Sequence, residues 1–387
     1  MEPNKTVSGS LFGRDGRGWG LPLLFLMVAS GILLSLWGKE IRSGSFLIGD
    51  CPYYASAAVS LLVDGDLDLR NQLKGGLEVH QKQVALGLHG EWYPKHPILM
   101  SALSVPFYAG LGVAGFLVFN LLVLSCLAGV VWALCRRHVK PSLATLSTTS
   151  LLAGTFLRAY VYNYSPDLFA ALLFLGGLFF VLRERPVGGG FFLGMSVLAK
   201  ITNLFGLLIV AAFACFRADR KQAARLAAGA LPALLLLALI NSLMFGSPAT
   251  TGYDRTLVLA DGKAVTVSHR GFFDLPISEG VWGQLFSART GLLPTSPALL
   301  LALPGFFILL RRRPWEGLLV LCLCEFTFLL FSTYRWWGTS HYGNRFLMVP
   351  VALSAIPLSL SFEQVRVTLG RRRGSPALLA PTVSGGK

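Results

Sequence analysis

The chain is dominated by long apolar runs that charged residues rarely interrupt. An apolar stretch of about 20 residues is long enough for a helix to cross the hydrocarbon core of a bilayer. The first such run, 19–37, has a tryptophan at each end, as helices anchored at a membrane interface often do. Further runs occupy 113–134, 142–157, 165–182, 226–245, 291–310, 315–334 and 346–362.

One apolar stretch is too long for a single span. It runs from Arg185 to Arg217 and is interrupted only by Lys200, which predicts two short helices that meet at 200–203. The run 98–111 either extends the second span or lies in the interface. We therefore expect about ten spans. The predicted fold class is an all-α integral membrane protein, a polytopic helical bundle with interfacial helices in its outer loops.

Composition and charge support this interpretation. Of the 387 residues, 53% are hydrophobic and 14% charged, and the mean hydropathy is +0.60. Soluble domains have about 25% charged residues, so an ordinary cytosolic enzyme, a disordered scaffold and a secreted disulfide framework are excluded. The net charge of +15 would suggest nucleic acid in a soluble protein. Here its distribution gives another explanation.

Basic residues gather on one side of the predicted membrane. With a cytoplasmic N-terminus, the cytoplasmic segments hold 20 of the 34 basic residues but six of the 19 acidic ones. This is the positive-inside pattern. It predicts that both termini are cytoplasmic, and it accounts for the charge without a nucleic-acid partner. The abundance of Ala, Gly, Leu and Arg favours a bacterial inner membrane.

The chain divides into three parts. Residues 1–18 are a cytoplasmic segment, 19–362 a transmembrane domain and 363–387 a basic cytoplasmic tail predicted to be disordered. The first span lacks a small-residue cleavage site, so we expect a retained signal anchor. Two long loops, 38–97 and 246–290, face outward, which makes the outer face the expected working face. In the second, Asp261-Gly262 lies between two β-rich runs and predicts a hairpin.

No metal motif is evident. The six cysteines have neither metal-ligand nor redox spacing, so neither a disulfide nor a zinc site is expected. Asp64, Asp66 and Asp68 alternate as in a calcium loop, but the glycine and distal glutamate of an EF-hand are missing, which favours a simple turn. No cofactor is therefore assigned, and dependence on a divalent metal stays open because no ligand cluster is visible.

Charged residues do collect at the outer boundary of the membrane. Asp50 lies just beyond the first span, Lys200 lies between the two short helices, and Arg158, Arg335 and Arg345 lie at outer ends of spans. Taken singly, such residues often only anchor a helix at the interface. Together they place one acid and four cations at similar depth. That pattern indicates a site for an anionic head group that approaches from within the bilayer.

A sugar attached to a polyprenyl phosphate is a substrate of this kind. Its departing phosphate needs cations, which Arg and Lys supply, and it needs no separate general acid. The acceptor hydroxyl needs one base, and a single carboxylate is sufficient. An inverting transfer thus requires one Asp, several cations and a groove at membrane level, not the carboxylate pair of a glycosidase.

Several short motifs carry a family resemblance. They are Gly49-Asp50 followed by Tyr53-Tyr54, Lys95-His96-Pro97 leading into 103–108, Gly194 to Lys200-Ile201-Thr202, 291–297, and 336–346. With the order of one span followed by a long outer loop, the chain resembles GT-C-fold glycosyltransferases. This superfamily includes the lipid-phosphate-sugar-dependent protein mannosyltransferases and aminoarabinose transferases. The resemblance covers nearly the whole membrane portion.

The resemblance implies roles for individual residues. Asp50 would be the catalytic base, and Lys200 and Arg345 would hold the lipid phosphate. Many relatives have an acid directly after this Asp, whereas this chain has Cys51. The chain therefore lacks, at this position, a carboxylate that could bind a metal or position the acceptor.

Other residues are candidates for substrate binding. They are Arg335, Arg158, Lys95, His96, His341, Tyr54 and Trp337. Each histidine has the alternative of merely satisfying a hydrogen bond, and an aromatic belt at the interface would equally explain Trp337. The expected partners are a polyprenyl-phosphate-linked sugar donor, an envelope glycan, lipid or protein as acceptor, and membrane lipids.

Two other functions remain open. One is a transporter or flippase of a lipid-linked or anionic substrate. Glu325 supports this alternative, because it is the only acid well inside a predicted span. The internal symmetry typical of transporters is not evident. The other is a catalytically inactive GT-C-like subunit of an envelope-assembly complex, favoured by Cys51. Substitution of Asp50 separates them, because only an enzyme loses turnover while it keeps lipid binding.

Overall fold

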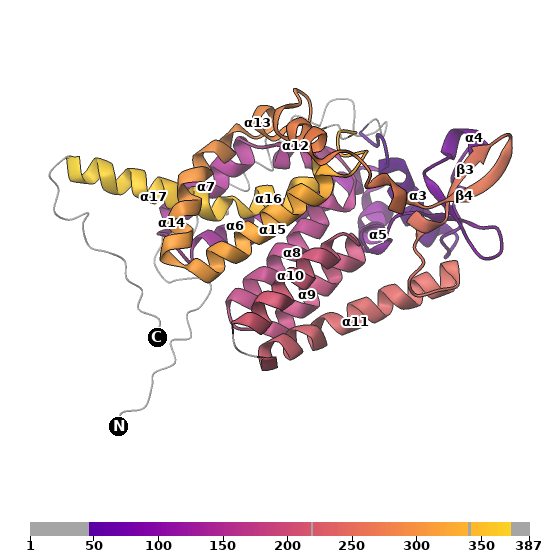
Figure 1. Ribbon diagram of the computed structural model, residues 1–387. Coiled ribbons are helices and arrows are strands. Elements are labelled where there is room, and N and C mark those ends of the chain that lie inside the picture. The colour runs from indigo at the N-terminus through magenta and orange to yellow at the C-terminus, as the bar shows by residue number, and fades with distance from the viewer. Residues whose placement is uncertain (1–45, 218–219, 340–341, 373–387) are drawn as a thin grey trace.

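The computed structural model describes residues 46–217, 220–339 and 342–372. The predicted first span 19–37, the segment 1–18, the tail beyond 372 and His341 lie outside the described residues. The described part is a helical bundle with a small sheet at one end (Figure 1). This confirms the helical fold class and adds the sheet to it.

Four helical segments of the described part are long and apolar enough to cross a membrane. They are α6 (Ala114–Cys135), α11 (Arg220–Phe245), α15 (Pro314–Ser332) and the stretch Arg345–Leu369. Shorter apolar helices accompany them: α3 (Cys51–Val63), α5 (Leu99–Leu111), α8 (Pro166–Leu182), α9 (Pro186–Ala199) and α10 (Asn203–Phe216). The run 98–111 is thus a helix of its own. The total of about ten spans stays a prediction.

The predicted break at Lys200 is present. Helices α9 and α10 are separated at 200–202, where Lys200 has extended backbone angles (φ −152°, ψ 106°). Helix α9 packs closely on α11, beside α8 and α10 (Figure 1). A Cβ atom at Gly190 would lie 1.9 Å from the carbonyl oxygen of Leu226, so glycine is required for this approach. Small residues commonly allow membrane helices to pack this tightly.

The run 291–310, predicted as one span, is divided. It forms α13 (Leu292–Thr295), the 3-10 helix η4 (Pro297–Ala302) and α14 (Leu303–Arg312). The cause is proline, which lacks an N–H and disfavours helix at the residue before it. Accordingly, Ser296, which precedes Pro297, has non-helical angles (φ −146°, ψ 54°).

The last predicted span, 346–362, is also interrupted and then continues further. The chain forms η5 (Arg345–Leu347), α16 (Met348–Leu353) and α17 (Ala355–Arg372). Helix α17 therefore passes the predicted boundary at 362, and the first ten residues of the predicted tail are helical. The remaining helix, α7 (Pro141–Ala153), leads into the 3-10 helix η1 (Phe156–Tyr162).

The two long outer loops are joined by a four-stranded antiparallel sheet. Its order is β2 (Trp92–Pro94), β1 (Val84–Leu86), β3 (Thr256–Ala260) and β4 (Lys263–Val267). The predicted hairpin is confirmed as β3–β4, with Asp261 and Gly262 at positive φ in its turn. The pairing of β1 with β3 was not predicted, and it brings the segment after β2 next to the second loop. The same two loops also contain the short helices α4 (Leu77–His80), η2 (Gly252–Asp254), η3 (His269–Phe272) and α12 (Ile277–Phe286).

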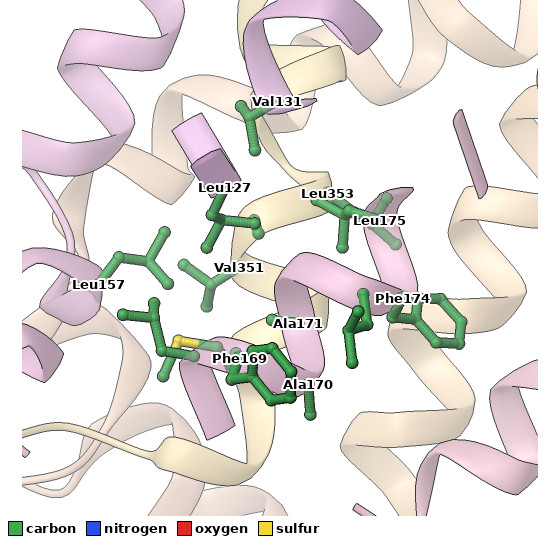
Figure 2. Packing of buried hydrophobic residues seen from close by; sticks show 14 of the residues in the cluster. Leu127, Val131, Leu157, Phe169, Ala170, Ala171, Phe174, Leu175, Val351 and Leu353 are labelled. Carbon is green, nitrogen blue, oxygen red and sulfur yellow. The ribbon is translucent and has the colours of Figure 1, made fainter. Parts of the chain in front are cut away.

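The main hydrophobic core lies between α6, α8 and α16. In Figure 2, side chains from these helices point toward one another, among them Leu127, Phe169 and Val351. All three are buried. This packing fixes the position of Asp167 at the start of α8 relative to Arg345, which directly precedes Phe346 and α16.

Candidate functional site

An ion pair joins the two ends of the described chain. Oδ2 of Asp50 lies 2.8 Å from Nη2 of Arg345, a residue 295 positions later. Asp50 directly precedes α3, and Gly49 before it has a positive φ of 61°, which suits glycine. Arg345 is the first residue of η5, where the preceding Asn344 side chain accepts a hydrogen bond from the backbone N–H of Phe346. Both charged side chains are largely buried.

The surrounding cations keep Asp50 ionised. Burial raises the pKa of this carboxyl, but the positive charges of Arg345 and Lys95, together with the neighbouring His96 imidazole, more than offset that effect, and the pKa lies far below its ordinary value. Opposite charges nearby favour the charged form of a buried acid. The site thus contains a carboxylate at neutral pH.

Lys95 and His96 reach this carboxylate from the end of the first outer loop. They follow β2, and both side chains are buried. The ammonium of Lys95 donates to the backbone carbonyl of Lys82, and burial lowers the pKa of Lys95 to about 8. Nε2 of His96 lies 4.0 Å from Oδ2 of Asp50. Burial lowers the pKa of His96 well below its ordinary value, so the imidazole is neutral at physiological pH.

His96 is enclosed by aromatic rings. Tyr54 stacks on it with ring centres 4.7 Å apart, and the hydroxyl of Tyr253 lies 2.8 Å from its Nδ1. Tyr253 belongs to η2 in the second outer loop, so both long loops contribute to the site. The sequence analysis missed Tyr253, because only the β1–β3 pairing brings it here.

Lys200 forms a second ion pair close to the first. Its Nζ lies 2.5 Å from Oδ1 of Asp167, whose other oxygen accepts a hydrogen bond from the hydroxyl of Ser165. Arg158, predicted to bind substrate, is exposed, and the nearby Asp167 is paired with Lys200 instead. Both cations lie near the ring of Phe346, with its centre 5.1 Å from Nζ of Lys200 and 5.2 Å from Cζ of Arg345.

Other predicted binding residues lie elsewhere or have other partners. Arg335 is exposed and forms an ion pair with Asp274. Trp337 packs against α12, where a Cβ atom at Gly283 would lie 2.2 Å from its ring. These contacts hold the outer segments to one another. Asp50, Lys95, His96, Tyr54 and Arg345 form one cluster, and Lys200 joins it through Phe346.

A groove leads away from the Lys200–Asp167 pair. It lies between α8, α10, α15 and α16, and apart from Lys200, Asp167, Thr202, Asn203 and Thr327 its lining is apolar. The apolar lining residues include Phe174, Phe205, Leu323, Phe326, Leu330 and Met348. The groove therefore combines a charged end with a hydrocarbon-like wall.

A second cavity lies beyond the turn at 200–202. Lys95, His96 and Tyr253 line one side, and Ile240, Asn241 and Met244 of α11 line the other. Ile201 lines this cavity, whereas Lys200 and Thr202 line the groove. Lys200 thus lines the groove, whereas Lys95 and His96 line the second cavity.

Two further sequence features have a clear location. The Cys51 side chain is buried in the core, and burial raises the pKa of its thiol to about 12. Among the residues that the structure describes, no group of three His, Cys, Asp or Glu side chains is arranged to hold a metal ion. Glu325 is exposed on the surface of α15 and lines neither the groove nor the second cavity.

Comparison with solved structures identifies the fold. The chain resembles ArnT from Cupriavidus metallidurans bound to undecaprenyl phosphate, with a TM-score of 0.57 and 16% identity over 92% of this chain and 62% of ArnT. It also resembles the archaeal oligosaccharyltransferase AglB from Archaeoglobus fulgidus in complex with an inhibitory peptide and a dolichol-phosphate. There the TM-score is 0.58 and the identity 14% over 94% of this chain and 52% of AglB.

A further structure of the Archaeoglobus fulgidus oligosaccharyltransferase, tethered to an acceptor peptide, matches with a TM-score of 0.61 at 13% identity, covering 94% of this chain and 51% of that protein. The chain therefore spans between half and two thirds of the length of these proteins. No family model matches the sequence, and no curated protein matches it. The likeness confirms the GT-C-like membrane fold predicted from the motifs.

Proposed function

We propose that this protein is a membrane glycosyltransferase that moves a sugar from a polyprenyl-phosphate donor to an acceptor on the outer face of a bacterial inner membrane. The observation that carries the proposal is the buried Asp50–Arg345 pair beside an apolar groove whose charged end is Lys200. The fold supports it, because the similar structures include ArnT with undecaprenyl phosphate and AglB with dolichol-phosphate.

The groove suits the lipid part of such a donor. Its wall is formed by apolar side chains, and its polar end places the Lys200 ammonium near Arg345. A polyprenyl chain in the groove would therefore bring its phosphate to these two cations. A guanidinium has five N–H donors, so Arg345 can hold Asp50 and a phosphate oxygen at the same time.

Asp50 is the base in this proposal. It accepts the proton of the acceptor hydroxyl while the oxygen attacks the anomeric carbon of the sugar. The bond from that carbon to the phosphate oxygen breaks on the opposite side, which inverts the configuration. The electron pair stays with the departing polyprenyl phosphate, where Lys200 and Arg345 stabilise the added charge.

The experiment is release of undecaprenyl phosphate from a panel of undecaprenyl-phosphate sugars. Purified protein is incubated with each donor and a total envelope extract as acceptor, and the lipid is followed by mass spectrometry. Asp50→Asn is compared with Asp274→Asn, an exposed carboxylate of the outer side that pairs with Arg335. Release by wild type and Asp274→Asn, but not by Asp50→Asn, is the expected result.

Two outcomes would contradict the proposal. Equal release by wild type and Asp50→Asn would leave a transferase but refute the assignment of the base. Co-purification of lipid without release by any of the three proteins would favour a transporter or a non-catalytic subunit.

A further inference from the structure

His96 presents one unused nitrogen to the site. Its Nε2 is buried and has no hydrogen-bond partner in the described part of the chain. The nearest acidic oxygen is Oδ2 of Asp50, at 4.0 Å, which is too long for a hydrogen bond. An oxygen atom about 2.8 Å from both atoms would bridge them at ordinary hydrogen-bond distances. Because an unpaired buried polar atom is costly, the gap favours a bridging ligand group.

The other nitrogen of His96 is held by Tyr253. The hydroxyl lies 2.8 Å from Nδ1, and the tyrosine ring meets the imidazole edge-on, with centres 5.4 Å apart. Tyr54 covers one face of the imidazole. These contacts prevent the imidazole from turning, so the direction of Nε2 is fixed.

The charges around His96 determine which nitrogen carries the proton. The imidazole is neutral, because burial, Lys95, Arg345 and His269 lower its pKa by more than Asp50 raises it. It therefore has one N–H. A nitrogen that faces a carboxylate is more stable as N–H, because two lone pairs would otherwise repel. Nε2 thus carries the proton toward Asp50, and Nδ1 accepts from the Tyr253 hydroxyl.

We propose that Tyr253 is a positioning residue that holds His96 with its Nε2–H toward Asp50, and that the acceptor's hydroxyl oxygen bridges Nε2 and Oδ2. This inference rests on the proposed transferase function. The bridging hydroxyl accepts a hydrogen bond from His96 and donates its own proton to Asp50. When the oxygen forms its bond to the sugar, that proton passes to Oδ2 and His96 keeps its own.

The bridge also defines the class of acceptor. The attacking atom must accept one hydrogen bond and donate another. A hydroxyl does both, whereas an ammonium has no lone pair and an amide nitrogen is a poor acceptor. The geometry therefore selects a hydroxyl acceptor over a protonated amine or an amide.

Two substitutions of His96 distinguish its nitrogens. The amide nitrogen of Gln reaches the neighbourhood of Nε2, whereas that of Asn lies near Nδ1. We expect His96→Gln to retain activity within about tenfold of wild type, and His96→Asn and His96→Ala to lose about 100-fold, the equivalent of one buried hydrogen bond left unmade. The assay is release of undecaprenyl phosphate, with envelope extract as acceptor.

Tyr253→Phe tests the positioning role. It should raise the apparent KM for the extract and lower kcat about tenfold, with the KM for the donor unchanged. Equal inactivity of all three His96 variants, with loss of the acid limb of the pH profile, would instead make His96 a titrating base. Wild-type rates in all of them would make it structural. Either result overturns the inference while leaving the proposed function in place.

A second measurement does not depend on turnover. In protein labelled with ¹⁵N-histidine in lipid nanodiscs, the resonance missing from His96→Gln identifies His96. We expect the Nε2–H tautomer in wild type and a mixture of tautomers in Tyr253→Phe. An Nδ1–H tautomer in wild type would overturn the inference. If wild type releases no lipid phosphate at all, the proposed function fails, and the NMR result still decides the orientation of His96.

Discussion

Lys200 and Arg345 lie against the same aromatic ring, that of Phe346, at 5.1 and 5.2 Å from its centre. Each cation is also paired with a buried carboxylate, Lys200 with Asp167 and Arg345 with Asp50. The two ion pairs therefore hold both cations at this one ring. A phosphate that enters shares cations already in position, which lowers the entropic cost of binding it.

Replacement of Arg345 should abolish transfer. In Arg345→Gln the Asp50 carboxylate loses its hydrogen-bonded cation, and truncation of one partner of a buried charge pair costs about 2–5 kcal/mol. We expect kcat/KM for lipid phosphate release to fall at least about 100-fold. Arg335→Gln is the matched control, since that arginine is exposed on the outer side, and it should stay within about threefold of wild type. Similar losses in both variants would argue against a special role of Arg345.

Lys200 should act on the donor and not on the acceptor. It lines the charged end of the groove, so Lys200→Gln should raise the KM for the undecaprenyl-phosphate sugar about tenfold or more, with the apparent KM for the envelope extract unchanged. Lys263→Gln, an exposed lysine in β4, is the control and should change neither constant. A raised KM for the extract alone would move the acceptor to this end of the groove.

Lys95 should determine an alkaline limit of activity. Burial lowers its pKa to about 8, so the ammonium beside Asp50 loses its proton as the pH rises through that value. The site then has one positive charge fewer, and we expect transfer to decline above about pH 8. Lys95→Arg keeps the charge at all accessible pH values, and its decline should move upward. An unchanged alkaline limb in Lys95→Arg would assign it to another group.

Much of the bundle follows from apolar patterning, whereas its irregular parts do not. The run that became α6 was predicted within one residue at each end, because it has neither proline nor charge. The prediction of a single span for 291–310 is wrong, because hydropathy does not reveal that Pro297 imposes non-helical angles on Ser296. The break at Lys200 was predictable, because a charged residue interrupts an apolar run that is too long for one span.

Site residues could be predicted where their depth in the membrane brings them together. They could not be predicted where the pairing of two distant loops does so. Asp50 and Arg345 were placed together because both lie at the outer end of a span. Tyr253 was missed, because its approach to His96 depends on a pairing between two loops about 170 residues apart in sequence. Arg335, like Arg345, lies at the outer end of a predicted span, and only the structure shows that it pairs with Asp274.

Close packing of α9 on α11 should make this contact sensitive to added volume. A methyl group at Gly190 would lie 1.9 Å from the backbone of Leu226, so Gly190→Ala must push the two helices apart. Overpacking of this kind typically costs about 1–3 kcal/mol. We expect a lower midpoint of thermal unfolding in detergent. Because α9 ends at Lys200, we also expect weaker binding of the lipid donor.

Gly129 of α6 provides the matched control. A Cβ atom there would meet nothing within 4 Å, so Gly129→Ala adds the same methyl group without a clash. Alanine also favours helix over glycine by about 1 kcal/mol, and the unfolding midpoint of Gly129→Ala should therefore equal or exceed that of wild type. Equal unfolding midpoints for Gly190→Ala and Gly129→Ala would show that α9 and α11 are not packed as closely as their glycines allow. The packing of α9 on α11 would then not determine the position of Lys200.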